Sequence, residues 1–483
     1  MNTLAIIGSG ISGLGAAWFL HREFDVTVFE AADYAGGHTC TVTVDEAGRA
    51  VAIDTGFMVF NHVTYPHLTR LFRTLDVPTK PTGMSFGVQH WPRKLEYSGS
   101  SLNHLFAQRR NLLRPSFYRL LRQIDRFNRE ATAALDDPAV RLMNLDDYVC
   151  RGGYGDDFAQ LYLLPMCSAV WSTPPEKLRR FPAATLLRFL HNHGLLGLAT
   201  QHQWWTVEGG AQRYVEKLTA PFRDRIRLRT PVRSVRRLAD GGIVVATDTA
   251  AARFDKVIFA CHAPASLALL GAGATADERR VLTPFKYQPN TATLHTDESV
   301  MPRTRRAWSA WNYRLDAPAG SAEYGPDGQG GGTSGANGRG RGKTAPLRQS
   351  PSRHAEPGMT PPGPDRASPE LCVSTHYWMN RLQGVSDRVN YFVSIEGTHL
   401  VAPARILRTL AYEHPLFDVA AAQAQPGLAG LNASARGRTE TYFAGAWQRY
   451  GFHEDGLLSA VNLATLLLGR DPWQAAGTPA KSP

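Results

Sequence analysis

Three glycines near the start of the sequence have the spacing of a phosphate-binding turn. Gly8, Gly10 and Gly13 follow a short apolar run, residues 3–7, and precede a predicted helix over residues 14–22. Gly8 permits a tight turn, Gly10 lets the backbone approach a pyrophosphate, and Gly13 allows close packing of helix on strand. The N-terminus of the helix would direct its partial positive charge at the phosphates. The pattern therefore predicts a dinucleotide-binding site.

An acidic residue ends the next predicted strand, residues 25–30. Glu30 lies 17 residues after Gly13, where a carboxylate can accept hydrogen bonds from ribose hydroxyls. Its negative charge disfavours a 2′-phosphate, so NADP would fit poorly. The two strands and the helix between them form one βαβ unit.

A second pair of glycines, Gly36 and Gly37, follows Glu30 and is itself followed by His38 and Thr39. This segment resembles the extended fingerprint of the flavin amine oxidase and phytoene desaturase superfamily. The resemblance implies FAD rather than NAD, because NAD dehydrogenases lack the second pair. It implies these cofactor contacts in the N-terminal segment: Gly8, Ser9, Gly10, Ile11, Ser12, Gly13, Glu30, Ala31, Gly36, Gly37, His38 and Thr39.

Four later segments carry the same resemblance, namely residues 54–57, 231–235, 257–264 and 443–456. They add the following implied FAD contacts: Gly56, Phe57, Val232, Gly445, Asp455, Gly456 and Leu457. The last segment leads into an apolar helix whose N-terminus should face the flavin's pyrimidine edge, where negative charge develops on reduction. The implied fold is mixed α/β, with a Rossmann-like FAD-binding domain and a discontinuous substrate domain of the amine-oxidase type.

The order of these segments predicts a divided chain. The FAD-binding domain is expected over residues 1–75, 205–285 and 436–472, and the substrate domain over residues 76–204 and 286–435. Residues 317–370 are dense in Gly, Pro, Ser and Arg, a composition that predicts a disordered insertion. Residues 473–483 are expected to form a flexible tail.

The sequence departs from the superfamily pattern at several positions. Arginines that are common after the ribose acid and after the glycine pair are replaced by Ala32, Tyr34 and His38. The flavin-facing lysine of amine oxidases has no counterpart, because the matching strand carries Asn290 or Thr291 there. These departures weaken the prediction of amine oxidation. Non-covalent FAD is expected, since no cysteine lies beside the C-terminal flavin segment.

Within the superfamily, the chain most resembles a bacterial group of FAD-dependent oxidoreductases linked with cyclopropane, methyl-branched and furan fatty-acid synthesis. The resembling segments are residues 36–39, 54–61, 203–210, 287–297, 376–383, 412–418 and 446–456. The resemblance implies removal of hydride from a hydrophobic substrate by a desaturase or dehydrogenase of methylated fatty acyl chains. The alternatives are a carotenoid-like desaturase, a flavin amine oxidase or, from another class, a lipid- or protein-binding chain with the fold of the Rab GDP-dissociation inhibitors.

Hydride removal also needs a group that takes a proton. His453 and Glu454 lie in the segment nearest the implied flavin, and His295 lies on a predicted strand of the substrate domain, so these three are the candidate catalytic residues. A lone histidine on a strand is often structural instead. The five cysteines lack metal-ligand spacing, which predicts no metal site and reduced thiols in a cytoplasmic protein.

The net charge of +11 favours contact with anionic surfaces. A predicted helix has an apolar stripe and a basic opposite face. The stripe is Leu113, Phe117, Leu120, Ile124 and Phe127, and the basic face is Arg119, Arg122, Arg126 and Arg129. This face is either solvated or meets an anionic membrane, which would place the protein peripherally on the inner membrane surface. Nucleic acid is not an expected partner, because the one RGRG tract lacks interleaved aromatic residues.

Overall fold

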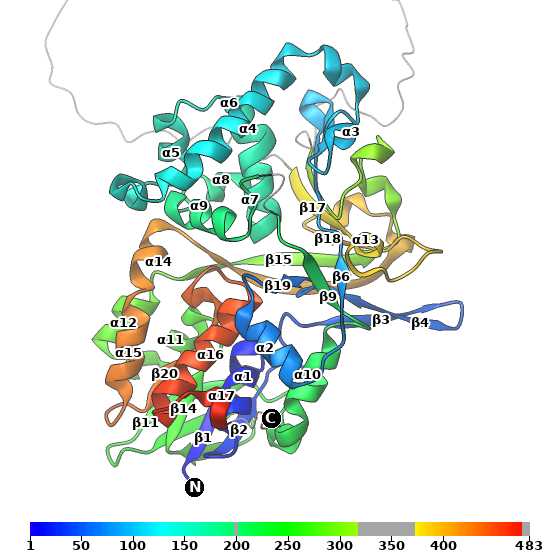
Figure 1. Ribbon diagram of the computed structural model, residues 1–483. Helices are drawn as coiled ribbons and strands as arrows, with labels where there is room; N and C mark the ends of the chain where they lie inside the picture. The colour runs from blue at the N-terminus through cyan, green and yellow to red at the C-terminus, as the bar shows by residue number, and fades with distance from the viewer. Residues whose placement is uncertain (198–200, 317–371, 476–483) are drawn as a thin grey trace, which may run out of the picture.

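A parallel sheet forms the lower half of the molecule in Figure 1. The computed structural model describes residues 1–197, 201–316 and 372–475. The strand order is β10 (Ile226–Arg227), β2 (Asp25–Phe29), β1 (Thr3–Ile7), β14 (Lys256–Phe259) and β20 (Thr441–Phe443). All neighbouring strands are parallel. Both faces of such a sheet are covered, which explains why β1 is apolar at nearly every position.

The two faces of β1 pack against different layers. Leu4 and Ile6 belong to a core shared with α1 (Ile11–Leu20) and α16 (His453–Leu468). Ala5 and Ile7 belong to a core shared with a second sheet of three antiparallel strands, β11 (Val232–Arg237), β12 (Ile243–Thr247) and β13 (Ala251–Phe254). This alternation follows from the two-residue period of a strand.

A close contact between α1 and α16 fixes the approach of the two helices to the sheet. A Cβ atom at Gly15 would lie 2.9 Å from Leu457 Cδ1 and 3.2 Å from the Ala460 Cβ. The helices therefore pack at a separation that a larger residue at position 15 would prevent. The N-terminus of each helix then lies beside the ends of β1 and β14.

A seven-stranded sheet lies between the parallel sheet and the upper helices. Its order is β19 (Ile406–Leu416), β15 (Lys286–His295), β18 (Phe392–Ile395), β17 (Cys372–Trp378), β16 (Trp311–Asp316), β7 (Phe86–His90) and β8 (Leu95–Ser98). The long strands β15 and β19 pair antiparallel along almost their whole length, with Asn290 opposite Tyr412 and Gln288 opposite His414. They cross the middle of the molecule in Figure 1.

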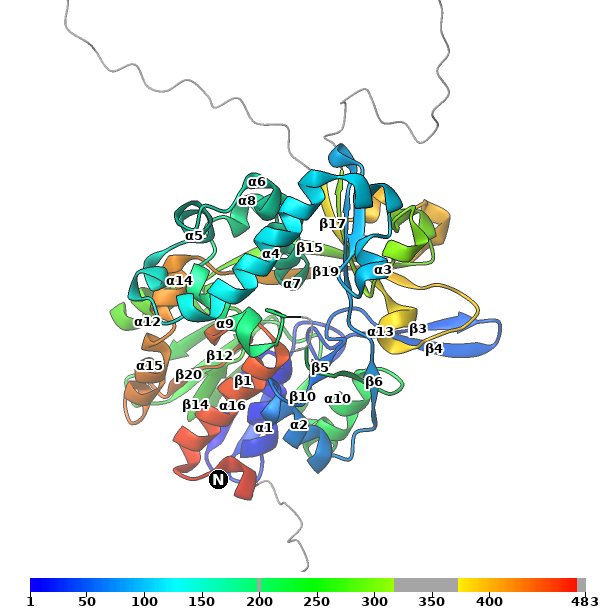
Figure 2. The same cartoon turned by 45° about the horizontal axis from the view of Figure 1, so that its top comes forward.

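A helical layer covers the upper part of the molecule in Figures 1 and 2. Its main helices are α4 (Pro115–Ala134), α5 (Leu145–Arg151), α7 (Leu164–Trp171) and α9 (Ala183–Asn192). Their shared core includes Phe127, Phe158 and Leu186, all fully buried. Helix α4 begins at Pro115, so Leu113 precedes the helix and is 86% exposed. The prediction that Leu113 belongs to the apolar stripe of this helix is therefore wrong.

The mixed α/β prediction is confirmed. All five strands of the parallel sheet come from segments assigned to the FAD-binding domain, and all seven of the larger sheet from segments assigned to the substrate domain. A further sheet of three strands joins the two halves through β5 (Phe60–Asn61), β9 (Trp204–Val207) and β6 (Thr79–Thr82). The domain boundaries themselves stay a prediction.

The predicted insertion over residues 317–370 lies outside the described residues. The prediction of a flexible tail is wrong for its first residues, because α17 (Pro472–Ala475) follows α16 and Trp473 is buried. The Trp473 ring meets Trp18 and Phe19 edge-on, at 5.8 and 4.9 Å between centroids. Residues 476–483 lie outside the described residues. None of the described helices combines the length and apolar character needed to cross a membrane.

Candidate functional site

One cavity of about 1330 Å³ runs from the ends of β1 and β14 into the helical layer. It is lined by most of the residues that the sequence predicted as cofactor contacts. They are Gly8, Ser9, Gly10, Ile11, Ser12, Glu30, Ala31, Gly36, Gly37, His38, Gly56, Phe57, Val232 and Gly445. The fold thus brings to one surface segments that are more than 400 residues apart in the sequence.

The glycine turn has the shape that a pyrophosphate needs. Gly8 has a φ of +104°, and a Cβ there would lie 2.8 Å from the carbonyl oxygen of Ala260. A Cβ at Gly13 would overlap the carbonyl oxygen of Gly8. At Gly10, by contrast, a Cβ would meet no protein atom within 4 Å. Gly8 and Gly13 are therefore required by the protein itself, whereas Gly10 borders open space in the cavity.

Glu30 joins the turn to the end of β2. Its carboxylate accepts hydrogen bonds from the Ser9 backbone N–H (2.9 Å), the Ser9 hydroxyl (2.6 Å) and the Ala32 N–H (2.8 Å). These donors hold the carboxylate at the cavity wall, where it can also accept bonds from ribose hydroxyls. The chemistry of this donor and acceptor set fits the adenosine end of a dinucleotide.

His38 contributes a buried nitrogen without a protein partner. Its ring stacks on Tyr412 at 4.9 Å, and its Nε2 is buried with no hydrogen bond to any described residue. Burial, followed by the neighbouring His414, lowers the pKa of His38 to about 3. The ring is therefore neutral at physiological pH. His38 lines the cavity, and a buried polar atom without a protein partner calls for a specific explanation, such as a hydrogen bond supplied by a ligand.

His414 is held in a single tautomer by Asn290, its diagonal neighbour across β15 and β19. The His414 Nδ1 lies 2.8 Å from Asn290 Oδ1, and the Asn290 amide donates to the carbonyl oxygen of Ser172 at 3.1 Å. The amide nitrogen is thereby committed to Ser172, so Oδ1 must accept from a protonated Nδ1. The lone pair of His414 is then on Nε2. Burial lowers its pKa to about 4.

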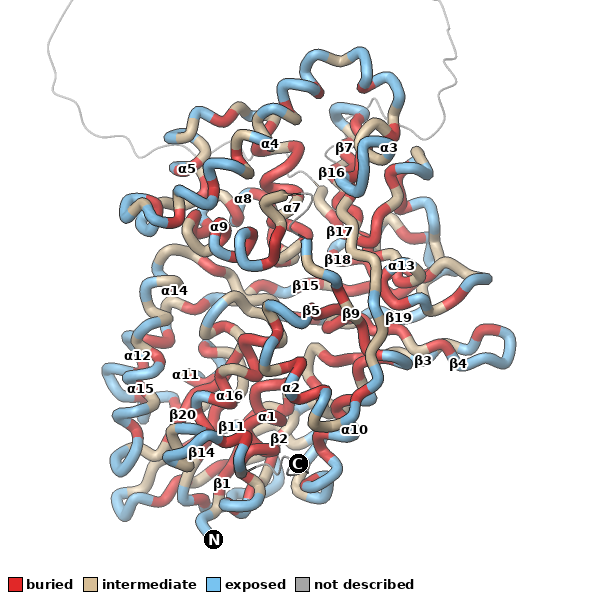
Figure 3. Tube along the Cα trace, viewed as in Figure 1, coloured by how far each residue is buried: buried red, intermediate tan, exposed pale blue. Residues whose placement is uncertain are grey.

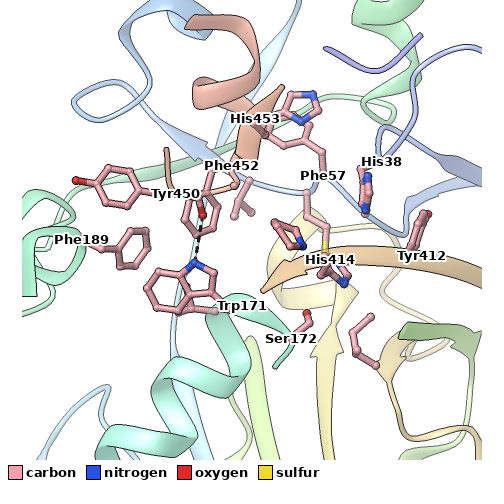
Figure 4. A pocket seen from close by; sticks show the side chains of 18 of the residues that line it. His38, Phe57, Trp171, Ser172, Phe189, Tyr412, His414, Tyr450, Phe452 and His453 are labelled. Atoms are coloured by element: carbon pink, nitrogen blue, oxygen red, sulfur yellow. Dashed lines mark hydrogen bonds between the residues drawn. The ribbon is translucent and has the colours of Figure 1, made fainter. Parts of the chain in front are cut away.

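His414 also lines the cavity, close to His38 at 5.3 Å between ring centroids, as Figure 4 shows. Sequence reasoning did not identify it as a site residue. In the sequence, residues 412–418 carry only a family resemblance, and Asn290 is only the residue at the position of a lysine in amine oxidases. The pairing register of β15 and β19 would have revealed the contact, because it makes Asn290 and His414 diagonal neighbours.

His453, at the first position of α16, lines the cavity with its ring. It stacks on Phe57 at 3.9 Å with an interplanar angle of 12°. Its Nε2 lies 2.6 Å from Tyr214 Oη and 3.1 Å from Thr39 Oγ1. Burial lowers the pKa of His453 to about 3. This edge of the ring is occupied by protein, so the geometry favours a positioning role; catalysis by His453 remains a prediction.

The structure does not support His295 and Glu454 as catalytic residues, since neither lines the cavity. His295 is fully buried in the seven-stranded sheet, with its Nε2 2.7 Å from Ser394 Oγ. The Glu454 carboxylate accepts hydrogen bonds from the N–H groups of His67 and Leu68, at 3.0 and 2.9 Å. These donors begin α2 (Pro66–Thr74), so Glu454 ties α2 to α16.

Five predicted cofactor contacts also lie behind the cavity wall: Gly13, Thr39, Asp455, Gly456 and Leu457. The Asp455 carboxylate caps α16 by accepting from the Tyr450 and Phe452 N–H groups, and burial raises its pKa to about 6. Gly456 is needed for packing, because a Cβ would lie 2.6 Å from Ile11 Cγ2. These side chains shape the site without facing it.

Replacing Glu454 by glutamine tests the structural role assigned to it. Burial raises its pKa from 4.5 to about 7, so the folded state holds a proton that the unfolded state releases. The extra proton stabilises the folded state at low pH, and this stabilisation is lost as the pH rises from about 4.5 through about 7. The Glu454→Gln variant should lack this dependence. Its free energy of unfolding, relative to wild type, should rise by about 3 kcal/mol between pH 4.5 and pH 8.

Urea unfolding across that pH range measures the difference. Flavin reduction in the same variant is the control, because a structural role leaves its rate within a few-fold of wild type. A loss of about 100-fold or more with an unchanged fold would restore Glu454 as a general acid or base.

Cys261 is the cysteine that lines the cavity within the described residues. Burial raises the pKa of its thiol to about 11, and its sulfur lies 3.4 Å from Ser266 Oγ. A thiol that stays protonated is a poor nucleophile. This chemistry agrees with the expected non-covalent cofactor.

The far arm of the cavity, beyond His38 and His414, is apolar and aromatic. Figure 4 shows Trp171, Phe189 and Phe452 together on the side opposite His38 and Tyr412. The arm is lined by Tyr65, Leu105, Leu121, Ile124, Tyr162, Met166, Val170, Trp171, Phe189, Leu195, Trp204 and Phe452. Trp171 Nε1 donates to the carbonyl oxygen of Tyr450 at 3.2 Å, which satisfies its polar atom. These side chains present mainly hydrocarbon surface to the cavity, and Asp125, Asn128 and Arg129 of α4 complete this part of the lining.

Comparisons with known proteins agree with this geometry. Residues 11–310 match the family model described as flavin containing amine oxidoreductase. Cyclohexylamine oxidase from Brevibacterium oxydans IH-35A is similar in structure, with a TM-score of 0.61 and 14% identity over 97% of this chain and 99% of that one.

Two further solved structures are similar over almost their whole length. The CLA-producing fatty acid isomerase from P. acnes has a TM-score of 0.60 and 14% identity, covering 96% of this chain and 98% of that one. A putative protoporphyrinogen oxidase from Exiguobacterium sp. 255-15 has a TM-score of 0.57 and 15% identity, covering 97% and 98%. At these identities the likeness shows the fold.

Proposed function

Since the chain belongs to the family of flavin-containing amine oxidoreductases, we propose that it is a desaturase or dehydrogenase acting on fatty acyl chains, methylated ones among them. That the protein is an FAD-dependent oxidoreductase follows from the family. The alternative of a cofactor-free lipid- or protein-binding chain is therefore not retained. FAD, when bound, supplies the acceptor for a hydride. The glycine turn, Glu30, Gly36, Gly37 and His38 would hold it.

The observation that carries the proposal is the apolar arm. A fatty acyl chain offers only C–H surface, and burying each CH₂ group contributes about 0.8 kcal/mol. Aromatic and aliphatic side chains line the arm from His414 to Leu105. Such a wall binds and orients a hydrocarbon and keeps water from the reacting carbon.

The charged groups of the cavity argue against a cationic amine as substrate. Among the described lining residues, the carboxylates are those of Glu30, Asp125 and Glu413. Glu30 is committed to the glycine turn, Asp125 pairs with Arg129 at 3.0 Å, and Glu413 lies 2.9 Å from His262 Nδ1. No described lysine lines the cavity, and Lys286 pairs with Asp418 instead. A flavin amine oxidase stays the second candidate, because cyclohexylamine oxidase shares the fold.

Removal of two hydrogens leaves a proton for the protein to take. His414 is suited to this, since Nδ1 donates to Asn290 and the lone pair on Nε2 is free to accept. Its pKa of about 4 keeps it unprotonated at physiological pH. We assign His414 Nε2 as the proton acceptor and Asn290 as its positioning residue.

Anaerobic bleaching of the flavin absorbance tests the proposal. Dispersed fatty acyl chains, methyl-branched and unsaturated, should bleach it, whereas cyclohexylamine, putrescine and carotenoids should not. Met166→Trp, which fills the apolar arm on α7, should slow bleaching by acyl chains and leave the FAD content unchanged. Bleaching by amines alone would overturn the proposal in favour of amine oxidation, and bleaching by carotenoids alone would favour a carotenoid-like desaturase.

A further inference from the structure

A group of large apolar side chains projects into solvent at the far end of the helical layer. Nine large hydrophobic residues are exposed in the described chain, and four of them are Leu102, Leu112, Leu113 and Tyr118. They lie on α3 (Leu102–Leu105), η2 (Arg109–Leu113) and the first turn of α4. Leu113 and Leu102 are 86% and 74% exposed. We call residues 102–122 the entrance tip; it is the pale blue top of the molecule in Figure 3.

The entrance tip is also uniformly positive. Residues 97–124 contain five arginines and no aspartate or glutamate. Arg109 and Arg110 donate to backbone carbonyl and side-chain amide oxygens, for example those of Phe106 and Gln108. The other three, Arg114, Arg119 and Arg122, have no ion pair with any described residue. The tip thus combines exposed leucines with unneutralised cations.

The cavity opens beside the entrance tip. Its lining includes several residues that are themselves exposed at the surface, on the segment that leads into α3, at the start of α3 and on α4. They are Gly99, Ser100, Ser101, Leu102, Asp125 and Arg129. Leu102 belongs both to the cavity wall and to the tip. A molecule that touches the tip is therefore at the mouth of the apolar arm.

We propose that the entrance tip docks on an anionic bilayer and admits the acyl chain directly from it. This inference rests on the proposed function, because the arm must take a hydrocarbon. The leucines would enter the boundary between headgroups and acyl chains, and the arginines would meet the lipid phosphates. The acyl chain would then pass from the bilayer into the apolar arm past Leu102 without crossing water.

Two arginines of the predicted basic face are not available to a membrane. Arg126 is committed to protein, with its guanidinium 4.3 Å from the Tyr154 ring centroid and a bond to the carbonyl oxygen of Gly152. Arg129 pairs with Asp125. Only Arg119 and Arg122 of the predicted basic face remain available. A bilayer fits the tip better than a protein partner, because leucines and arginines without carboxylates match phosphate headgroups over hydrocarbon.

Vesicle co-sedimentation of the FAD-bound protein tests the docking. The protein should bind vesicles of equal parts phosphatidylglycerol and phosphatidylcholine, bind pure phosphatidylcholine weakly, and lose affinity as salt rises. Arg114, Arg119 and Arg122 changed together to glutamine should bind the anionic vesicles on the order of 100-fold more weakly, at about fivefold per charge. Leu112→Ser with Leu113→Ser should remove the binding that persists at high salt.

The matched control changes Arg236, Arg408 and Arg438 to glutamine. These exposed arginines make no ion pair with described residues and lie on β11, on β19 and before β20. Because the change in net charge is the same, binding by this variant should stay close to wild type. The docking proposal would be overturned if the two triple variants lost vesicle binding equally, or if the tip variant bound as tightly as wild type. Equal binding of the wild type to neutral and anionic vesicles would also overturn it.

Flavin bleaching by detergent-dispersed acyl chains separates the two proposals. If acyl chains bleach the flavin but the substitutions in the entrance tip leave vesicle binding unchanged, only the docking proposal fails. If acyl chains never bleach the flavin, the proposed function fails whatever the vesicles show.

Discussion

Replacing Gly10 by valine is expected to give a folded protein that purifies almost without flavin. Gly10 has a φ of −68° and a ψ of 179°, an extended conformation that valine adopts readily. A Cβ at this position meets no protein atom within 4 Å, and it points into the open part of the cavity. The added side chain therefore enters the space where the pyrophosphate is expected, and its Cβ meets no described protein atom. Affinity for FAD should fall at least about tenfold, equivalent to about 1.4 kcal/mol.

The ratio of flavin absorbance to protein absorbance measures the loss, and thermal unfolding of the flavin-free forms shows that the fold survives. Gly430→Val on α15 (Gly427–Ala435) is the matched control, because a Cβ there also meets nothing within 4 Å. Gly13→Ala should behave differently and destabilise the protein itself, since its Cβ overlaps Gly8. A Gly10→Val protein with full flavin content would show that the pyrophosphate lies elsewhere.

Replacing His414 by glutamine should slow flavin reduction by acyl chains by about 10²- to 10⁴-fold, the usual contribution of a general base. The FAD content should not change. The sign of the pH dependence follows from the lowered pKa. The accepting form of His414 is the unprotonated one, which prevails above a pKa of about 4 rather than 6.5. Wild-type reduction should therefore be nearly flat from pH 8 down to about 5.5.

Asn290→Asp is the companion variant for the positioning role. A carboxylate beside Nδ1 favours the protonated ring and raises the pKa of His414. Reduction should then decline as pH falls toward neutrality, a change that a purely structural role for Asn290 would not produce. Stopped-flow reduction across pH checks both variants. A His414→Gln protein that reduces at the wild-type rate would remove His414 from the reaction.

Much of the cofactor site follows from local sequence. The glycine turn, the strand before it and the helix after it are contiguous, so the spacing of Gly8, Gly10 and Gly13 already specifies a phosphate-binding turn. Glu30 is placed by the next strand of the same unit. The family follows from several such segments together. Local motifs are predictable because each needs only its immediate chain neighbours to take its shape.

The predicted site residues whose side chains turn away from the cavity are placed by contacts between distant segments. Glu454 and Asp455 stand beside each other in a flavin motif, yet their carboxylates bind backbone N–H groups, at the start of α2 for Glu454 and just before α16 for Asp455. His295 lies on a strand that borders the site, but its side chain faces Ser394. The sequence does not reveal which partners a buried polar side chain will find, since those partners are fixed by packing.

The sequence by itself determined the family, and with it the cofactor FAD, and it predicted that the first βαβ unit holds the dinucleotide, because those residues act through the local backbone. The tertiary structure decided which side chains face the reacting end of the cavity. His414 meets Asn290 only through the register of β15 and β19. Leu113 completes a helical pattern in the sequence, yet it is exposed because α4 begins two residues later, at Pro115. Burial and cross-strand register belong to the assembled fold, and they determine which residues can meet a substrate or a membrane.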